Sequence, residues 1–220
     1  MVGIHTQFYG CGLPGEPSRP SPSPTEPARA WEGIALGIVI PPPGSPVLIL
    51  TGPPGVGKTT AAAVLADRHP AAVHLESDRF FHFIHSGYVE PWRPESHQQN
   101  AVVMRIVGEA AAGYASAGYF TIVDGIVIPR WFLTPLRDVL QAAGHAVAYV
   151  ILRAPLDTCT ARVQAREGTP TVDPEALAGI WSQLTDLGPC ERNVLDVDGL
   201  SPAEAATAIE EILTAGSHLL

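Results

Sequence analysis

The chain has 220 residues, enough for one domain of ordinary size together with a tail. Its formal net charge of −9 argues against duplex nucleic acid or an anionic membrane as the main partner, because both attract a basic surface. No apolar run approaches the ~20 residues that a membrane helix needs, so no membrane span is predicted.

Residues 1–46 differ in composition from the rest of the chain. They hold ten of the 22 prolines, with Ser, Gly and Glu between them, a composition that cannot build a packed core. We therefore expect a proline-rich, disordered extension over 1–46 and one domain over 47–220, with an edge strand at 34–40 left open. No basic segment followed by an apolar one opens the chain, so no signal peptide is predicted and the cytoplasm is the default location.

Residues 47–50 are apolar and predict a short strand buried on both faces. The next segment, GPPGVGKT from Gly52, fits the P-loop pattern G-x-x-x-x-G-K-[ST], and the Ala- and Leu-rich residues 60–68 predict a helix behind it. Glycines let backbone N–H groups wrap a polyphosphate at a helix N-terminus. Lys58 can reach the β- and γ-phosphates, and the Thr59 hydroxyl can bind Mg²⁺. The predicted ATP-binding residues are Gly52, Pro53, Pro54, Gly55, Val56, Gly57, Lys58, Thr59 and Thr60.

A second strand is predicted at 72–76, followed by a helix at 79–86, a loop at 87–94 and a long helix at 95–117. The second strand leads to Asp78. A carboxylate there can take the proton from a substrate hydroxyl that attacks the γ-phosphate. An aspartate before an apolar helix is also a good N-cap, and the two roles can coexist.

A third strand at 119–123 leads to Asp124-Gly125, and a helix at 129–143 follows. Apolar residues followed by Asp form a Walker-B-like pattern, in which the carboxylate holds Mg²⁺ directly or through water. The alternative is that Asp124 and Gly125 form an ordinary turn.

A fourth strand at 146–152 precedes a helix at 155–167 that carries Arg162 and Arg166. These arginines are four apart and share one helix face, where they can neutralise phosphate charge during transfer; a solvated helix face is the alternative. Residues 168–174 interrupt the helix and can form a small lid. A helix at 175–187, a fifth strand at 193–197 and a helix at 202–214 complete the chain.

Five apolar strands separated by helices imply a parallel sheet covered on both faces, with ligands at the carboxyl ends of the strands. Aromatic and basic residues flank Asp78 and Asp124 in the sequence and can line an acceptor pocket, although half-buried packing explains them equally well. They are Tyr88, Trp92, Arg93, His97, Arg130 and Trp131.

With these residues, positions 47–214 resemble the small P-loop kinases, such as chloramphenicol phosphotransferase, gluconate kinase and shikimate kinase, and more distantly adenylate kinase. The resemblance implies an α/β fold, the three-layer αβα P-loop NTPase fold, with a five-stranded parallel sheet of order 2-3-1-4-5. It also implies that Arg162 and Arg166 match the lid arginines, that Asp78 matches the acidic residue that contacts or deprotonates the acceptor, and that the turn 199–202 lies near adenine. Ser77 departs from the pattern, because many relatives carry an acidic residue there.

The predicted function is transfer of the γ-phosphate of Mg-ATP to a hydroxyl of a small molecule, a metabolite or an antibiotic. Lys58, Asp78, Arg162 and Arg166 are the predicted catalytic residues, and Thr59 and Asp124 the metal-binding residues. The alternatives are a nucleotide kinase and a regulatory P-loop ATPase or switch with a protein partner. The pattern names no acceptor, does not choose between ATP and GTP, and leaves the oligomeric state open.

Overall fold

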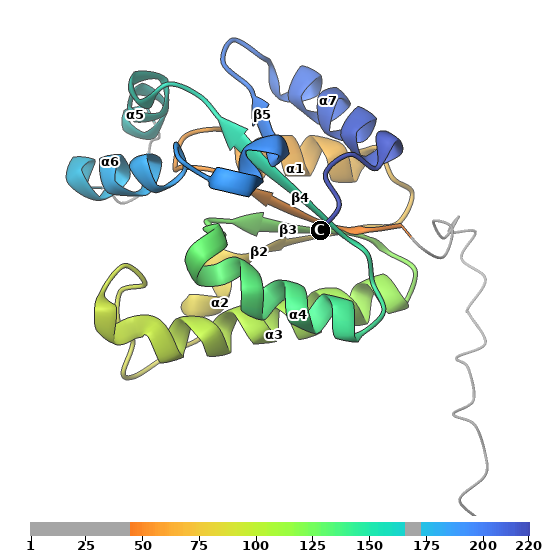
Figure 1. The fold of residues 1–220 in the computed structure, drawn as a ribbon, viewed down its shortest axis with the longest axis horizontal. Helices are drawn as coiled ribbons and strands as arrows, with labels where there is room; N and C mark the ends of the chain where they lie inside the picture. Colours follow the sequence, from red (N-terminus) through yellow and green to blue (C-terminus); the bar gives the residue numbers. More distant parts are fainter. Residues whose placement is uncertain (1–44, 166–172) are drawn as a thin grey trace, which may run out of the picture. The chain divides into compact units, whose positions relative to one another are not determined.

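A computed structural model of the chain describes residues 45–165 and 173–220 (Figure 1). The predictions for residues 1–44, for Arg166 and for most of the lid at 168–174 lie outside the described residues. The strands are β1 (Val47–Thr51), β2 (Ala72–Glu76), β3 (Phe120–Gly125), β4 (Val147–Arg153) and β5 (Val194–Asp196). The helices are α1 (Lys58–Asp67), α2 (Ser77–Phe81), α3 (His97–Ser116), α4 (Thr134–Ala142), α5 (Leu156–Gln164), α6 (Pro174–Gln183) and α7 (Pro202–Ala215), with the short turns η1 (Pro94–Ser96), η2 (Pro129–Leu133) and η3 (Gly188–Asn193).

The strands form one parallel sheet with the order β2-β3-β1-β4-β5, which confirms the predicted fold class and strand order. The register makes the carboxyl ends of three strands level. Asp124 of β3 lies beside Leu50 of β1 on one side and beside Glu76 of β2 on the other. The segments that follow these strands, the P-loop and α2, therefore start at the same edge of the sheet as Asp124.

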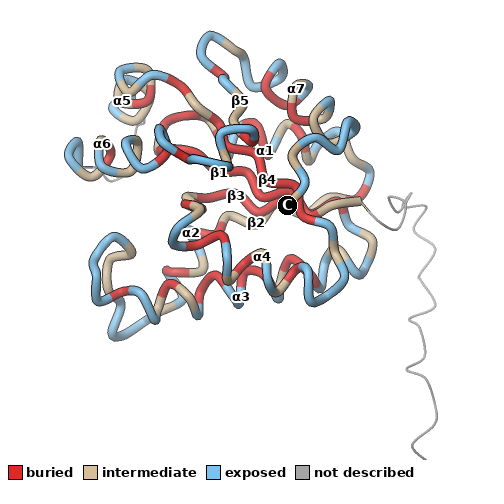
Figure 2. The backbone as a smooth tube through the Cα atoms, viewed as in Figure 1, coloured by how far each residue is buried: buried red, intermediate tan, exposed pale blue. Residues whose placement is uncertain are grey.

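Helices cover both faces of the sheet because successive apolar residues of each strand point to opposite faces. Val47 and Ile49 pack into a core with α3 and α4, whereas Leu48 and Leu50 pack into a second core with α1 and α7. Figure 1 shows these two pairs of helices on opposite sides of the sheet, and Figure 2 shows the central strands β1, β3 and β4 as the buried layer between them. The architecture is the predicted three-layer αβα arrangement.

The single helix predicted at 129–143 is wrong, since the structure has the π-helical turn η2 and then α4. Pro135 lacks an N–H and its ring excludes the carbonyl four residues earlier, so one continuous α-helix cannot form. The N–H groups of η2 converge instead on the carbonyl of Ile128; the donors are Trp131, Phe132 and Leu133.

Four other helix predictions are also too long. The helix predicted at 155–167 is α5, which ends at Gln164. The helix predicted at 79–86 is α2, which ends at Phe81 because the next N–H groups bond to carbonyls three residues back, as in a 3₁₀ turn. The helix predicted at 95–117 starts at His97, after a 3₁₀ turn that Pro94 opens. The helix predicted at 175–187 ends at Gln183.

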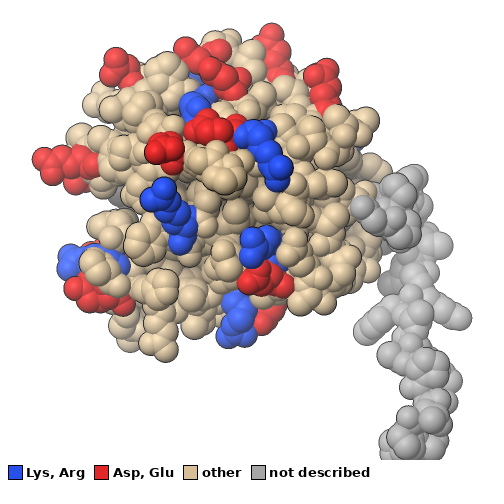
Figure 3. All heavy atoms as spheres, viewed as in Figure 1, with Lys and Arg blue, Asp and Glu red and all other residues tan. Residues whose placement is uncertain are grey.

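The coloured surface in Figure 3 shows Lys and Arg side chains as separate groups among Asp and Glu, and they do not merge into one basic patch on this face. Within the ranges 45–165 and 173–220, none of the helices has the length and apolar character needed to cross a membrane.

Candidate active site

The P-loop joins the buried strand β1 to α1 and depends on glycine for two different reasons. A Cβ on Gly55, whose φ is +82°, would collide with the backbone carbonyl of Cys159 in α5, so the loop lies directly on that helix. At Gly57, nothing lies within 4 Å of a Cβ, and the left-handed backbone with φ +106° is what requires glycine. Gly57 is the N-cap of α1 and offers no side chain to the first N–H groups, which suits an anion at this helix terminus.

Lys58 is the first residue of α1 and bends back over the loop. It is only 9% exposed, and its Nζ donates to the carbonyl of Pro53 at 3.1 Å. Thr59 and Thr60 follow it and are exposed, and the first turn of α1 contains no acidic side chain that would repel an anion. The helix terminus and Lys58 therefore present positive charge to the same loop.

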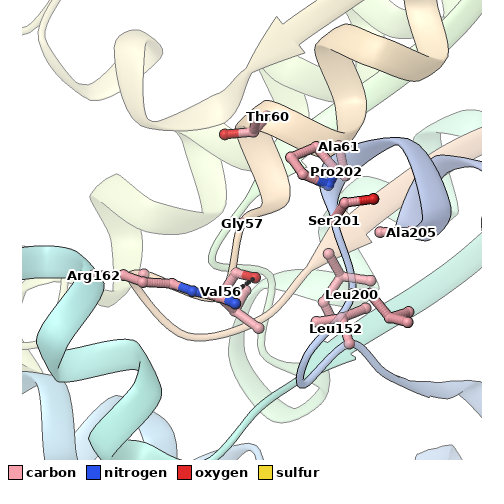
Figure 4. A pocket seen from close by; sticks show the side chains of 12 residues that line it. Val56, Gly57, Thr60, Ala61, Leu152, Arg162, Leu200, Ser201, Pro202 and Ala205 are labelled. Carbon is pink, nitrogen blue, oxygen red and sulfur yellow. Dashed lines mark hydrogen bonds between the residues drawn. The ribbon is translucent and has the colours of Figure 1, made fainter.

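A pocket of about 290 Å³ opens beside the P-loop (Figure 4). One wall consists of the loop and the first turn of α1, and the other consists of residues 200–202 with Ala205 of α7. Arg162 of α5 closes one side and donates from Nη1 to the carbonyl of Val56 at 3.3 Å. The structure thus brings Arg162 and the turn after β5 to the same loop.

Asp124 ends β3 in the interior of the sheet and is 2% exposed. Its Oδ2 lies 3.2 Å from Nε2 of His74 in β2, and its Oδ1 is buried without a hydrogen-bond partner. Gly125 continues the strand, so the alternative of an Asp-Gly turn is not what the structure shows. In the described part of the chain, no cluster of three or more His, Cys, Asp or Glu could hold a metal alone. A cation at Asp124 would therefore need phosphate oxygens as further ligands, which is how proteins commonly bind Mg²⁺.

Asp78 lies in the first turn of α2 and faces charged groups from other elements. The N-cap of α2 is Glu76, so the alternative in which Asp78 caps this helix is not what the structure shows. The residue is exposed to solvent, although the protein atoms around it partly desolvate its carboxylate. Desolvation raises the pKa of Asp78, Lys58 lowers it, and the carboxylate of Asp124 raises it again. Lys58 and Asp124 are therefore near enough to Asp78 for their charges to act on it.

The segment after β3 is fixed to the sheet through the backbone of Val127. Its N–H donates to Oγ1 of Thr51 at 2.8 Å, and its carbonyl accepts from the hydroxyl of Tyr149 at 2.6 Å. Both side chains are fully buried, and burial raises the pKa of Tyr149, so that the hydroxyl stays protonated and donates. Because Thr51 directly precedes the P-loop, these bonds hold the end of β3 in a fixed position relative to the loop.

The loop at 87–96 is held against α3 by side-chain hydrogen bonds. The Gln99 amide donates to the carbonyl of Val89 at 2.6 Å and accepts from its N–H at 2.9 Å. Ser96 and Asn100 both donate to the carbonyl of Pro91, at 2.9 and 2.8 Å. This connection is therefore an ordered wall, and its shape is set by α3.

Exposed aromatic side chains lie on this loop and on η2. Tyr88 and Trp92 of the loop are 43% and 68% exposed. Trp131 of η2 is 54% exposed, and its ring meets that of His97 edge-on with centroids 6.5 Å apart. Desolvation raises the pKa of Tyr88 most, and the charges of Glu90 and then of Asp78 add to the rise. The aromatic surface thus reaches the neighbourhood of Asp78.

The arginines of this region differ in their partners. Arg79 pairs with Glu76 at 2.7 Å and Arg93 with Glu90 at 2.8 Å, so their charges are compensated locally. Arg130 is exposed at the start of η2 and makes no ion pair with any residue that the structure describes. Of these three arginines, Arg130 is therefore the one whose charge no described acidic residue compensates.

A family model of the AAA domain matches residues 47–186. Among similar solved structures, the tunicamycin resistance protein of Deinococcus radiodurans is 23% identical, with a TM-score of 0.58 over 80% of this chain and 98% of that one. A sugar kinase from Janibacter sp. HTCC2649 is 25% identical, with a TM-score of 0.57 over 77% and 95%. A gluconokinase from Sinorhizobium meliloti 1021 is 19% identical, with a TM-score of 0.59 over 80% and 94%. No curated protein sequence matches the chain. These similarities confirm the P-loop kinase fold.

Two contacts at the site were not predicted from the sequence. His74 stands in the predicted strand 72–76, and its partner Asp124 is 50 residues away. A polar residue inside an apolar strand was the only signal. The second contact is between Ser77 and Gly125, where the hydroxyl lies so close that a Cβ on the glycine would collide with it. Both contacts depend on β2 and β3 being neighbours in the sheet.

Proposed function

The chain belongs to the AAA domain family, and from that premise we propose that it transfers the γ-phosphate of ATP to a hydroxyl group of a small molecule. The observation that carries the proposal is geometric: Asp78 in the first turn of α2, Asp124 at the end of β3 and the P-loop with Lys58 all lie at one edge of the sheet. Nucleotide binding requires the phosphate-binding cation and a carboxylate for the metal. A second carboxylate beside them suits a reaction in which a hydroxyl must lose its proton.

The nucleotide occupies the P-loop and the pocket beside it. Residues 52–60 bind the phosphates through backbone N–H groups and Lys58, and the space between Val56 and residues 200–202 receives the nucleoside. Arg162 stabilises the charge that develops on the phosphoryl group in transfer, which its contact with the loop at Val56 supports. We propose the same role for Arg166, which stands four residues after Arg162 in the sequence.

Mg²⁺ fits this edge of the sheet because Oδ1 of Asp124 is a buried carboxylate oxygen without a partner. Asp124 and the hydroxyl of Thr59 would hold the ion together with phosphate oxygens. When bound, Mg²⁺ neutralises negative charge on the β- and γ-phosphates.

Asp78 accepts the proton that the reaction releases. The acceptor oxygen forms a bond to the γ-phosphorus while the bond from that phosphorus to the bridging oxygen of ADP breaks, and the hydroxyl proton passes to the Asp78 carboxylate. A raised pKa makes Asp78 a stronger base than an ordinary aspartate, and the charge of Lys58 keeps part of it ionised.

The surroundings of Asp78 favour an acceptor that carries a ring. Tyr88 offers an apolar face on which a sugar or aromatic ring can stack, and Trp92 is a second exposed aromatic ring on the same loop. Arg79 and Arg93 are already paired with glutamates, which leaves Arg130 as the one arginine of these three with an uncompensated charge to attract an anionic substrate.

Acceptor-stimulated release of ADP tests the proposed function. The panel contains sugars, nucleosides and hydroxyl-bearing antibiotics, with anionic hydroxy acids of similar size for comparison. We expect at least one alcohol to accelerate ADP release and to gain one phosphate in mass spectrometry. Lys58→Ala should lower that turnover by about 10²–10³-fold, the usual effect of removing one such electrostatic contact. The same slow ADP release with every compound would identify an ATPase and not a kinase.

Two carboxamide variants separate the acceptor side from the metal site. Asp78→Asn should bind Mg-ATP normally in isothermal titration but transfer phosphate about 10²–10⁴-fold more slowly, the range for a positioned base. Asp124→Asn should weaken Mg-ATP binding in a way that depends on the Mg²⁺ concentration. If Asp78→Asn lost ATP binding while turnover per bound ATP stayed normal, Asp78 would belong to the nucleotide site.

A further inference from the structure

The contact between His74 and Asp124 crosses from β2 to β3. The register places Glu76 directly beside Asp124, and His74 is two residues earlier in β2, on the same face of the sheet as Glu76. Nε2 of His74 lies 3.2 Å from Oδ2 of Asp124, with 16% and 2% of the two side chains exposed. Glu76 turns to Arg79, so the partner of Asp124 is the histidine and not the residue beside it.

This hydrogen bond gives one carboxylate oxygen of Asp124 a partner and leaves the other without one. Oδ2 accepts from His74, which requires that the imidazole carries its hydrogen on Nε2. Oδ1 is buried and has no partner. Buried polar atoms are nearly always hydrogen-bonded, so an oxygen left without a partner in the interior indicates a group that binds there when the site is filled. A metal ion supplies such a partner, because a carboxylate oxygen is a ligand that Mg²⁺ prefers.

We infer that His74 is a positioning residue for the metal site, holding the Asp124 carboxylate by Oδ2 so that Oδ1 is free to coordinate the cation of the bound metal–nucleotide complex. The inference rests on the proposed Mg-ATP site. An N–H donor suits this task because it fixes the rotation of the carboxylate without itself competing for the metal. Its loss leaves the carboxylate free to turn and leaves a second buried oxygen unpaired.

The test measures metal binding and needs no acceptor. Each variant is titrated with Mn²⁺, followed by electron paramagnetic resonance, in the presence of the non-hydrolysable ATP analogue AMPPNP. His74→Ala should weaken Mn²⁺ binding by about 10–100-fold, the usual effect of removing a partner of a metal ligand. His74→Gln should lose clearly less, because its amide N–H can reach the same oxygen. Binding of AMPPNP in EDTA should stay unchanged in both variants, which also shows that the fold is intact.

A matched control is provided by His69, which lies at the opposite end of β3. Its ring stacks on Phe120 at 3.8 Å and its Nε2 lies 4.0 Å from Glu210, so it is also a partly buried histidine near an acid. His69→Ala should leave Mn²⁺ binding unchanged.

If His74→Ala bound Mn²⁺ as tightly as the wild type, His74 would have a merely structural role. The same would follow if His74→Gln bound Mn²⁺ as weakly as His74→Ala while both variants bind AMPPNP in EDTA. If His74→Ala does not fold, His74→Gln is compared with the wild type instead. A Mn²⁺ affinity of His74→Gln between those of the wild type and Asp124→Asn supports the inference. A Mn²⁺ affinity of His74→Gln equal to that of Asp124→Asn overturns it.

Failure of this inference differs visibly from failure of the proposed function. If no acceptor is found but His74→Ala loses Mn²⁺ affinity, the metal site stands and the kinase assignment falls. If the wild-type protein does not bind Mn²⁺ with AMPPNP, both fall together. If an acceptor is phosphorylated and His74→Ala binds Mn²⁺ normally, only the role of His74 is overturned.

Discussion

Asp78 shows how one residue can carry function at the expense of stability. Its surroundings desolvate it, and Asp124 repels its charge, while Lys58 only partly compensates. The folded protein therefore holds a proton on Asp78 more tightly than the unfolded chain does. The same environment that makes the carboxylate a better base also makes its ionised form unfavourable in the folded state.

We predict that Asp78→Asn is more stable than the wild type at neutral pH. Because folding raises the pKa of Asp78, the stability it contributes is complete below the ordinary aspartate pKa of about 3.9 and is lost as the pH rises through the folded value. Asparagine does not ionise, so the variant avoids this loss. The difference in melting temperature should be positive at pH 7 and should shrink toward zero in acid.

Differential scanning calorimetry from about pH 3 to about pH 8, a range that spans the titration of aspartate, measures this difference in melting temperature. Asp138→Asn, at an exposed aspartate of α4, serves as the control for loss of one negative charge. A variant Asp78→Asn that melts below the wild type at neutral pH would mean that attraction by Lys58 outweighs desolvation.

Residues whose function follows from local spacing were predictable, and those that act across strands were not. The P-loop motif places Lys58 and Thr59 by chain geometry alone. His74 needs Asp124, and that contact exists only because β2 lies next to β3. A sequence contains the strands but gives no direct sign of their order, so cross-strand pairs could not be predicted from the residues alone.

At the scale of elements, the close contact of α2 with the end of β3 decides where Asp78 stands. Ser77 is fully buried, its hydroxyl has no partner, and it lies against Gly125. A Cβ on Gly125 would collide with that hydroxyl and would lie 3.1 Å from Cβ of Ser77. Glycine at the end of β3 therefore lets α2 approach the sheet closely.

We predict that Gly125→Ala destabilises the protein by about 1–3 kcal/mol, as overpacking of a filled core does. It should also slow acceptor-stimulated ADP release, because α2 must move and carries Asp78 with it. Ser77→Ala alone should be nearly neutral, since it removes a hydroxyl that has no partner. In the double variant most of the lost stability should return, and urea unfolding measures this coupling.

Gly113→Ala is the matched control for the substitution itself. Gly113 lies inside α3, and nothing stands within 4 Å of its Cβ position. The same change there should stabilise the protein by about 0.5–1 kcal/mol through helix propensity. Effects of Gly125→Ala and Ser77→Ala that simply add would show that the hydroxyl is not the obstacle.

Helix boundaries were the least predictable part of the fold. The apolar periodicity of 129–143 indicates one amphipathic helix. The α-helix begins only at Thr134, however, because Pro135 has no backbone N–H to continue the hydrogen-bond pattern of a longer α-helix. Strand positions were predicted more accurately, because runs such as 47–50 are buried on both faces and show no helical periodicity of apolar residues.

At the scale of the whole molecule, the strand order came from the resemblance to kinases and not from periodicity. Five apolar runs are compatible with several orders of a parallel sheet, and the structure has the one that the P-loop kinases share. The sheet also has a feature that the sequence did not show. The C-terminal residues pair with β4: Leu219 bridges Ala148 in antiparallel fashion, Leu220 donates to the carbonyl of Val147 and Tyr149 donates to that of His218, both at 3.0 Å.

The two ends of the chain should therefore respond differently to truncation. We predict that removing residues 1–40 leaves the melting temperature and ATP binding unchanged, because their composition supports few buried contacts. Removing residues 218–220 should lower the melting temperature, although the deletion is much smaller. Val147 and Tyr149 are 1% and 0% exposed, so their backbone groups would lose partners inside the core. One such unpaired group costs about 1–3 kcal/mol, and each 1 kcal/mol lowers the melting temperature by about 2–4 °C in a protein of this size.

Thermal unfolding of both truncated proteins, with ATP titrations on each, gives the comparison. The C-terminal truncation should keep its ATP affinity at temperatures where it is folded, because the paired residues lie at the start of β4 and the P-loop faces its end. A clear fall in melting temperature on removal of residues 1–40 would mean that the segment 34–40 packs on the domain. An unchanged melting temperature without residues 218–220 would mean that water replaces the tail at the edge of β4, and that the sheet is stable without this added pairing.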